Sequence, residues 1–169
     1  MKGASAPFLR LEDLMEKATF AAGCFWGVED AFSTIPGIIS TRVGYIGGHM
    51  EHPTYHDVCS GMSGHAEAVE VTFDPSIISY NQLLDIFWRC HDPSQLNRQG
   101  PDMGTQYRSA IFYDSDAQKQ MAEKSRELLE HSARLRRPVV TEIVPFATFW
   151  EAEDYHQKYH QKHSAGCGF

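Results

Sequence analysis

The stretch Thr19-Phe20-Ala21-Ala22-Gly23-Cys24-Phe25-Trp26-Gly27 places a cysteine between a strand pattern and a helix pattern. The apolar run from Ala18 to Ala22 predicts a short strand that ends at Gly23. Apolar residues then recur at helical spacing until Pro36-Gly37, which predicts a helix whose apolar face holds Phe25, Val28, Phe32 and Ile35. The Cys24 sulfur is therefore expected at a strand-to-helix junction, on the first turn of the helix.

The rest of the chain continues this alternation of strands and helices. Strands are predicted at 38–46, 65–73, 107–113 and 139–145, and helices at 80–90, 115–133 and 149–163. Ser115 is the expected N-cap of the second-last helix, whose buried face is predicted to hold Ala117, Met121 and Leu128. The order indicates an α+β fold, a two-layer sandwich with a mixed sheet around a split βαβ (ferredoxin-like) core.

Two long segments, 47–64 and 92–106, are predicted to be loops, and loops of this length usually carry function. The chain has 169 residues, which favours a single domain. We expect an N-terminal arm over residues 1–16, one domain over 17–163 and a flexible C-terminal tail over 164–169.

The charge balance argues against nucleic acid as a partner. The formal net charge is -7, with 15 basic and 22 acidic residues, so the protein repels phosphate backbones. No apolar run approaches the roughly 20 residues that a membrane helix requires. The N-terminus also lacks the apolar stretch of roughly 7–15 residues of a secretory signal, so we expect a cytoplasmic protein without a membrane partner.

The four cysteines indicate redox chemistry rather than structural bridges. They are Cys24, Cys59, Cys90 and Cys167, and no two form a Cys-x-x-Cys pair. Cys167 stands between two glycines on the tail, where an exposed thiol is open to oxidation and can reach Cys24 by thiol exchange. Cys90 lies in an apolar run and is expected to be structural, whereas a role for Cys59 stays open.

Cys24 is the first candidate catalytic residue. Free backbone N–H groups at a helix start favour an anion and can lower a thiol pKa from about 8.5 to roughly 3.5–7.5. Gly23 would permit the tight turn, and Gly27 would admit a ligand. The alternative is a buried structural cysteine, and the local sequence favours neither interpretation over the other.

Glu67 is the second candidate. In the strand 65–73 its side chain shares a face with Val69, Val71 and Phe73, the apolar face. Because burial removes solvation, the pKa of this carboxyl is expected to rise, and the protonated group could act as a general acid. The alternative is a glutamate that is solvated at the strand end.

Weaker signals come from two tyrosines and three histidines. Tyr55 lies in the first long loop and Tyr107 directly follows the second, and at each position a phenol either packs or serves a site. The histidines fall on one face of the predicted last helix: His156, His160 and His163. Since His-Glu-x-x-His is absent, we expect a polar surface there and no metal site.

Several motifs together resemble the A-type peptide methionine sulfoxide reductases, from about residue 17 to the end of the chain. These enzymes reverse methionine oxidation, one enzyme for each sulfoxide epimer. The motifs are Gly23-Cys24-Phe25-Trp26-Gly27, Pro53-Thr54-Tyr55, Gly64-His65-Ala66-Glu67-Ala68-Val69, His91-Asp92-Pro93, Gly104-Thr105-Gln106-Tyr107-Arg108-Ser109 and Glu153-Asp154-Tyr155-His156-Gln157.

The resemblance implies a role for each candidate. Cys24 would attack the sulfoxide sulfur, Glu67 would protonate the oxygen, and Cys167 would resolve the resulting sulfenic acid as a disulfide. The other implied residues are the oxygen-binding hydroxyls of Tyr55 and Tyr107, the methyl-binding wall of Phe25 and Trp26, and the supporting residues Asp102, His156 and Tyr159.

The resemblance also implies the partners. The substrates would be free methionine (S)-sulfoxide and oxidised proteins, and no cofactor is expected besides thioredoxin or a dithiol as reductant. We expect a monomer.

Some positions depart from the family, and two other functions compete. Gly166 stands where some relatives have a tyrosine, and Pro101 where they often have asparagine. A peroxide-reducing enzyme could use the same cysteines, but it needs no apolar methyl pocket. A histidine-rich metal-binding module is the other alternative.

Overall fold

A split βαβ unit forms the centre of the structure, a computed structural model that describes residues 10–163. Strand β1 (Glu16–Ala22) leads into helix α1 (Phe25–Ser33), which returns to strand β2 (Ile38–Ile46). Strand β3 (Ala66–Phe73) lies between β1 and β2 and runs antiparallel to both. The unit is therefore split by β3, as the sequence predicts.

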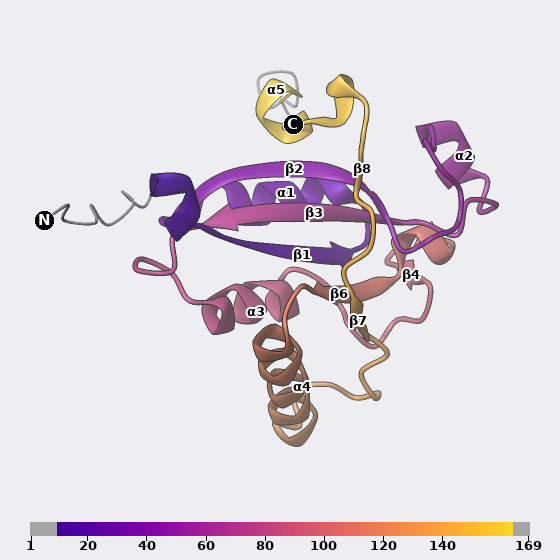
Figure 1. Cartoon of the computed structure of the whole chain (residues 1–169). Helices are drawn as coiled ribbons and strands as arrows, with labels where there is room; N and C mark the ends of the chain where they lie inside the picture. The colour runs from indigo at the N-terminus through magenta and orange to yellow at the C-terminus, as the bar shows by residue number, and fades with distance from the viewer. Residues whose placement is uncertain (1–9, 164–169) are drawn as a thin grey trace, which may run out of the picture.

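Three further strands complete a mixed sheet of six strands (Figure 1). After helix α3 (Tyr80–Arg89), strand β6 (Ser109–Tyr113) pairs antiparallel with the outer edge of β1. Strand β7 (Glu142–Pro145) is parallel to β6, and β8 (Trp150–Glu151) is antiparallel to β2. The order β7-β6-β1-β3-β2-β8 contains the ferredoxin-like arrangement, so the expected α+β sandwich is confirmed.

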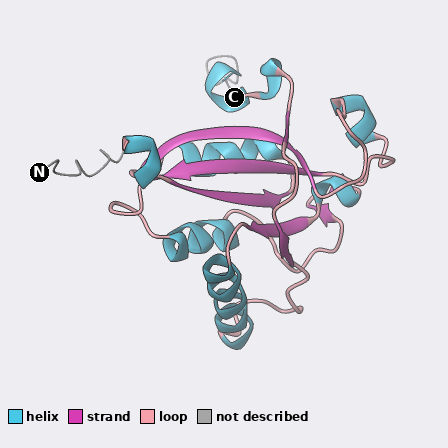
Figure 2. Cartoon of the chain, in the orientation of Figure 1, coloured by secondary structure: helices cyan, strands magenta, loops and turns pink. Residues whose placement is uncertain are grey.

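The long helix α4 and several short elements occupy the connections, as the secondary-structure colouring of Figure 2 shows. They are η1 (Leu11–Leu14), α2 (Tyr55–Cys59), β4 (Arg98–Gln99), β5 (Asp102–Met103), η2 (Thr105–Tyr107), α4 (Asp116–His131), η3 (Asp154–His156) and α5 (Tyr159–His163). The two predicted long loops therefore contain α2 in one case and the β4–β5 hairpin with η2 in the other.

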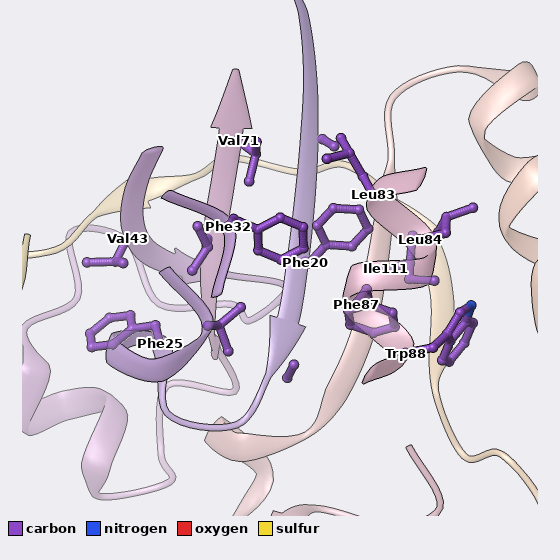
Figure 3. Packing of buried hydrophobic residues seen from close by; sticks show 14 of the residues in the cluster. Phe20, Phe25, Phe32, Val43, Val71, Leu83, Leu84, Phe87, Trp88 and Ile111 are labelled. Atoms are coloured by element: carbon purple, nitrogen blue, oxygen red, sulfur yellow. The ribbon is translucent and has the colours of Figure 1, made fainter. Parts of the chain in front are cut away.

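The main core lies between the sheet and helices α1 and α3 (Figure 3). The ring of Phe20 on β1 stacks on Phe32 of α1 and on Phe87 of α3, with ring centroids 5.3 and 5.2 Å apart. Val69 and Val71 of β3 belong to the same cluster. Burying these apolar side chains is the main favourable contribution to folding and holds α1 against the sheet.

The opposite face of the sheet is covered by the chain itself. Figure 1 shows the segment between β7 and β8 crossing in front of the sheet, with α1 behind it. The side chains on this face are mostly small, and Val144 and Phe149 pack against them. Alanines at positions 21, 66, 68 and 110 let the crossing segment lie close to the strands.

Helix α4 differs from its prediction in the face that it buries. Ser115 is the N-cap and accepts a hydrogen bond from the Gln118 backbone N–H at 3.2 Å. However, Ala117 is exposed and Leu128 is 60% exposed, whereas the buried residues include Gln118, Ala122 and Leu129. The side chain of Gln118 donates to the Lys17 carbonyl at 2.8 Å, and this contact favours the orientation observed.

The prediction of one helix over 149–163 is wrong. The segment contains β8, η3 and α5 instead, because Gln157 uses its amide to bind the edge of β2. Its oxygen accepts from the Val43 N–H at 2.9 Å, and its nitrogen donates to the Val43 carbonyl at 2.9 Å. Lys158 then adopts a positive φ of 53°, which interrupts a helix.

Strand β1 begins at Glu16, inside the expected arm 1–16, and the predicted tail 164–169 with Cys167 lies outside the described residues. Between residues 10 and 163 no helix has both the length and the apolar character needed to cross a bilayer.

Candidate active site

Cys24 lies where β1 gives way to α1 and occupies the N-cap position of that helix. Gly23 before it has φ +93°, and a Cβ there would come within 2.8 Å of the Gln99 Cβ atom. Glycine is therefore required at this turn, as the sequence predicts. The backbone N–H groups of Trp26 and Gly27 interact with the Cys24 sulfur and favour its thiolate.

Glu67 lies beside this helix start. Its side chain is 1% exposed, and Oε1 accepts a hydrogen bond from the Phe25 backbone N–H at 3.2 Å. The structure thus brings the carboxyl to the residue next to Cys24, and it excludes the alternative of a solvated glutamate. Among residues 10–163, the other oxygen, Oε2, has no hydrogen-bond partner. A buried polar atom that lacks a hydrogen-bond partner is suited to bind a substrate atom.

The pKa of Glu67 is raised to about 7, as predicted in direction. Burial is the main cause, because it removes water from the charged form. The Phe25 N–H opposes the rise, and the nearby Asp102 carboxylate adds to it. The group therefore carries a proton in a large fraction of molecules near neutral pH.

The expectation that the Cys24 pKa is lowered is wrong for the free protein. Burial raises the pKa of the thiol to about 11, and the Trp26 and Gly27 N–H groups oppose this only in part. The negative charges of Glu67 and Asp102 raise it further. Two N–H groups of a short helix do not compensate for loss of solvation beside two carboxylates.

Tyr107 and Tyr55 enter the site from different elements. Tyr107 ends η2, and burial followed by the charge of Glu67 raises its pKa to about 12. Tyr55 begins α2, and its pKa is raised mainly by burial and next by a hydrogen bond with the Cys59 side chain. Both hydroxyls stay protonated at neutral pH and can donate hydrogen bonds.

Trp26 is held in place by two aromatic neighbours. Its indole N–H donates to Nδ1 of His156 at 3.0 Å, and its ring stacks on Tyr159 with centroids 3.8 Å apart. Phe25 is fully buried and contacts His156 and Tyr45 with centroids 5.2 and 5.8 Å away. The predicted pocket residues are therefore neighbours, with Trp26 half-buried and Phe25 in the core.

The sequence predicts that the three histidines lie on one face of a single helix, but the structure places them on two different elements. His156 is buried in η3, whereas His160 and His163 are exposed on α5. Within residues 10–163 no three His, Cys, Asp or Glu side chains converge to hold a metal ion.

Glu153 was not assigned a role from sequence, although it lies in one of the quoted motifs. Its carboxylate accepts from the Tyr45 hydroxyl at 2.9 Å and from the Tyr55 backbone N–H at 3.1 Å. It therefore joins β2 to the start of α2 and fixes where Tyr55 stands. Its position in the motif Glu153-Asp154-Tyr155-His156-Gln157 is the one feature of the sequence that could have indicated this role.

The other described cysteines differ in environment. Cys90 donates to the Phe87 carbonyl at 3.2 Å, and burial raises its pKa to about 12, which agrees with a structural role. Cys59 is exposed at the end of α2, and Cys24, Cys59 and Cys90 are all free thiols.

The fold and this site define a class of protein, a thiol enzyme equipped to donate a proton. A cysteine at a helix start, a carboxyl with a pKa of about 7 and two phenols meet at one end of a ferredoxin-like sheet. Such a set can attack an electrophilic atom while protonating the oxygen attached to it.

Comparison with known proteins gives the family. The model of the family described as peptide methionine sulfoxide reductase matches residues 16–168. A relative from Methanothermobacter thermautotrophicus, named peptide methionine sulfoxide reductase MsrA, is 64% identical over 147 residues, which is 87% of this chain and 87% of that protein. The chain belongs to the A-type peptide methionine sulfoxide reductases and is an oxidoreductase that reduces methionine sulfoxide.

Solved structures agree with the fold. The reduced form of Mxr1 from Saccharomyces cerevisiae superposes with a TM-score of 0.84 at 36% identity, over 92% of this chain and 88% of that one. Mxr1 has also been solved in complex with Trx2, with a TM-score of 0.61 at 26% identity, over 86% of this chain and 84% of that one.

Proposed function

We propose that this enzyme reduces the S epimer of methionine sulfoxide, free and in proteins, with Cys24 as nucleophile and Glu67 as acid. The observation that carries the proposal is the contact between Glu67 and the Phe25 N–H, which holds a protonatable carboxyl beside the Cys24 sulfur. Attack on sulfur and protonation of oxygen must occur on one S–O bond, so the two groups have to be close.

The proton on Glu67 begins the reaction. Oε2, the buried oxygen without a partner in residues 10–163, would donate to the sulfoxide oxygen. The substrate sulfur then becomes cationic, and a positive charge next to Cys24 lowers the pKa of its thiol. The high pKa of the free thiol therefore falls when the substrate is protonated. This order explains how a buried thiol becomes nucleophilic only with substrate present.

The atoms and electrons of the step balance. The Cys24 sulfur would form an S–S bond to the substrate sulfur as the S–O bond of the sulfoxide breaks. The released oxygen would then bond to the Cys24 sulfur as the S–S bond breaks and its electron pair returns to the methionine sulfur, so that Cys24 becomes a sulfenic acid. Methionine is released. Glu67 gives one proton to the oxygen and regains one from the thiol, so its protonation state is restored.

Three further groups would orient the substrate. The hydroxyls of Tyr55 and Tyr107 would donate to the sulfoxide oxygen, as preorganised donors do in many active sites. Trp26 would receive the methyl group, since its ring is fixed by His156 and Tyr159 and loses little freedom on binding. Asp102 would hold the pKa of Glu67 up by its charge.

Recycling would pass through the C-terminal tail. The Cys167 thiol would condense with the Cys24 sulfenic acid to give a disulfide and water, and thioredoxin would reduce that disulfide. The complex of yeast Mxr1 with Trx2 supports thioredoxin as reductant. No prosthetic group is needed, because all electrons come from thiols. We place the cycle in the cytoplasm, where such thiols are kept reduced.

The test is incubation of the purified enzyme with each sulfoxide epimer and a dithiol, with methionine measured as product. We expect methionine from the S epimer at a rate at least about a hundred times that from the R epimer. Hydrogen peroxide serves as the control oxidant in the same assay. Equal use of both epimers, or faster loss of the Cys24 thiol with peroxide, would overturn the proposal.

A further inference from the structure

Helix α1 packs against α5 through one of its faces, which is formed by Trp26, Glu29 and Ser33. These positions are three and four residues apart, so their side chains lie along one side of the helix. Trp26 stacks on Tyr159, with ring centroids 3.8 Å apart. Ser33 accepts a hydrogen bond from the Gln161 side chain at 3.4 Å. Glu29 lies between these two contacts.

Glu29 is a buried carboxyl that binds two other parts of the structure. Its side chain belongs to a residue that is 2% exposed, whereas Trp26 and Ser33 are only partly buried. Oε2 accepts a hydrogen bond from the Thr41 hydroxyl on β2 at 2.9 Å, and Oε1 accepts from the backbone N–H of Lys158. Glu29 therefore ties α1 both to the sheet and to the residue immediately before α5.

Lys158 is the residue at which the chain turns into α5. Its φ of 53° lies in the left-handed region, which residues other than glycine adopt rarely. Tyr159 follows directly and begins α5. Since Glu29 holds the Lys158 N–H, this hydrogen bond sets the direction in which the chain enters α5, and with it the position of the Tyr159 ring.

The gap between α1 and α5 makes this turn depend on Glu29. The gap is lined by Trp26, Glu29 and Lys158 among others, and it leaves no volume for a water-sized molecule. Water therefore does not replace the carboxyl as acceptor in this packing. An apolar side chain would fill the same space without the desolvation of a polar group, but it would bind neither donor. The carboxyl is thus suited to fix one backbone atom rather than to add packing.

The hydrogen bond and the ring contact are linked through the chain. Glu29 and Trp26 lie one turn apart on α1, and their partners Lys158 and Tyr159 are adjacent residues. Movement of Lys158 away from Glu29 would therefore carry Tyr159 away from Trp26. The bond to His156 holds the edge of the Trp26 ring, whereas Tyr159 covers its face.

We propose that Glu29 is a positioning residue: by binding the Lys158 N–H it holds Tyr159 against Trp26 and keeps one wall of the methyl pocket rigid. The inference rests on the proposed function, in which Trp26 receives the methyl group of the substrate. Glu29 is buried, so it acts through the Tyr159 ring and does not touch the substrate itself. A wall that is already ordered loses little freedom when the methyl group binds.

This role separates the affinity for substrate from the rate of the reductive step. A loosened wall weakens binding of the ground state and of the transition state alike, which raises the substrate concentration that gives half the maximal rate. The maximal rate depends on Cys24 and on Glu67, whose carboxyl is held by the Phe25 N–H and not by α5. We therefore expect Glu29 to affect the first quantity and not the second.

The experiment measures methionine formed by the full chain in a single turnover without reductant, over a range of methionine (S)-sulfoxide concentrations. Glu29→Met keeps a similar volume but loses both carboxyl oxygens. Glu29→Asp keeps a carboxyl that is one methylene too short to reach both donors. Glu29→Gln is the conservative variant, because its oxygen accepts from the Lys158 N–H and its NH2 group donates to the Thr41 hydroxyl.

Two further variants and a control complete the set. Tyr159→Leu, alone and combined with Glu29→Met, tests whether the effect of Glu29 passes through Tyr159. Asp30→Asn is the matched control, since Asp30 is the next residue of α1 and is exposed.

A second readout does not depend on activity. With tryptophan labelled at nitrogen for NMR, the chain gives three indole signals, from Trp26, Trp88 and Trp150, and Trp26→Phe assigns the first. Loss of the Tyr159 ring from the face of Trp26 should shift the Trp26 signal in Glu29→Met, Glu29→Asp and Tyr159→Leu. The signals of Trp88 and Trp150 should stay in place, which shows that the variants are folded.

We expect the half-saturating concentration to rise roughly tenfold in Glu29→Met and in Glu29→Asp, as for the loss of one methyl-sized contact in an apolar pocket. The maximal rate should stay within about twofold of the wild type. Glu29→Gln and Asp30→Asn should match the wild type in both quantities. The double variant should equal Tyr159→Leu alone, because Glu29 then has no ring to position.

Three results would overturn the inference: an unchanged half-saturating concentration in Glu29→Met or Glu29→Asp, the same increase in Glu29→Gln, or a double variant in which the two single effects multiply. Absence of methionine from the wild type would overturn the proposed function instead. The Trp26 indole signal would in that case still show whether Glu29 holds Tyr159 in place.

Discussion

The Oε1 atom of Glu67 accepts a hydrogen bond from the backbone N–H of Phe25 at 3.2 Å. This bond joins the middle of the sheet to the first turn of α1, one residue after Cys24. The position of the carboxyl relative to the sulfur is therefore set by backbone elements and not by flexible side chains.

Replacing Glu67 by Gln should slow the reductive step by roughly 10²–10⁴-fold, the usual contribution of a placed general acid. Gln keeps an oxygen that accepts from the Phe25 N–H but has no acidic proton. Rapid-quench measurement of methionine in a single turnover tests this. Glu70→Gln is the control on the same strand: Glu70 binds Arg42 at 2.8 Å on the other face, so the rate should stay unchanged. An unaltered rate in Glu67→Gln would remove Glu67 from the role.

The reductive step should depend on pH through Glu67. The acid must be protonated, and its pKa is about 7, so the rate should be constant below that pH and fall about tenfold per unit above it. In Glu67→Gln the remaining slow rate should lose this decline. Single-turnover rates from pH 5 to 9 in both proteins provide the comparison. A rate that rises between pH 7 and 9 in the wild type would mean that deprotonation of Cys24 governs the step instead.

Glu67 should also lower stability at alkaline pH. Its pKa is higher in the folded protein, about 7 against 4.5, so the unfolded state loses this proton first as pH rises. Stability from this group is complete below pH 4.5 and lost as pH rises through 7, a loss on the order of 3 kcal/mol. Glu67→Gln should therefore gain stability relative to wild type between pH 5 and 8 in urea unfolding. A difference that does not vary with pH would contradict the raised pKa.

The site shows which features a sequence carries and which need the fold. The alternation of β3 predicts that Glu67 faces the core, and burial is the main cause of its raised pKa. The direction of the Cys24 pKa shift could not be predicted in the same way, because it is set first by burial of the thiol and then by the charges of Glu67 and Asp102, all of which depend on the fold. Local helix geometry favours the thiolate, but burial and these charges outweigh it.

The C-terminal segment is a second region whose structure the sequence pattern did not predict. The periodicity of residues 149–163 predicts one helix, but Gln157 binds Val43 of β2 and Glu153 binds Tyr45 and the Tyr55 N–H. These contacts join residues about a hundred positions apart, and no local pattern encodes them. The spacing of the three histidines predicts that His156 lies on a polar surface. In the structure His156 is buried instead and accepts the hydrogen bond from the Trp26 indole.

Removing either proposed oxygen-binding hydroxyl should slow methionine formation. Tyr107→Phe and Tyr55→Phe each lose one donor, and a hydrogen bond to a group that becomes charged contributes about 1.5–3 kcal/mol, or roughly tenfold to a hundredfold. Tyr113→Phe on β6 is the matched control and should keep the wild-type rate. The double variant shows whether both hydroxyls act on one oxygen, since its effect should then differ from the product of the single effects. Wild-type rates in both single variants would exclude these donors.

Replacing Cys167 by Ser should separate reduction from recycling. The reductive step uses Cys24 and Glu67, which the change leaves intact, so methionine should form in a single turnover at the wild-type rate. Thioredoxin-dependent turnover should fall at least about a hundredfold, because the disulfide that thioredoxin reduces contains the tail sulfur. The assay follows methionine in both regimes with the same enzyme preparation. Cys90→Ala is the control, since the thiol of Cys90 is buried and bonded to the Phe87 carbonyl. Unchanged thioredoxin-dependent turnover in Cys167→Ser would mean that thioredoxin reduces a bond without the tail, and the exposed Cys59 would then be the thiol that it reaches.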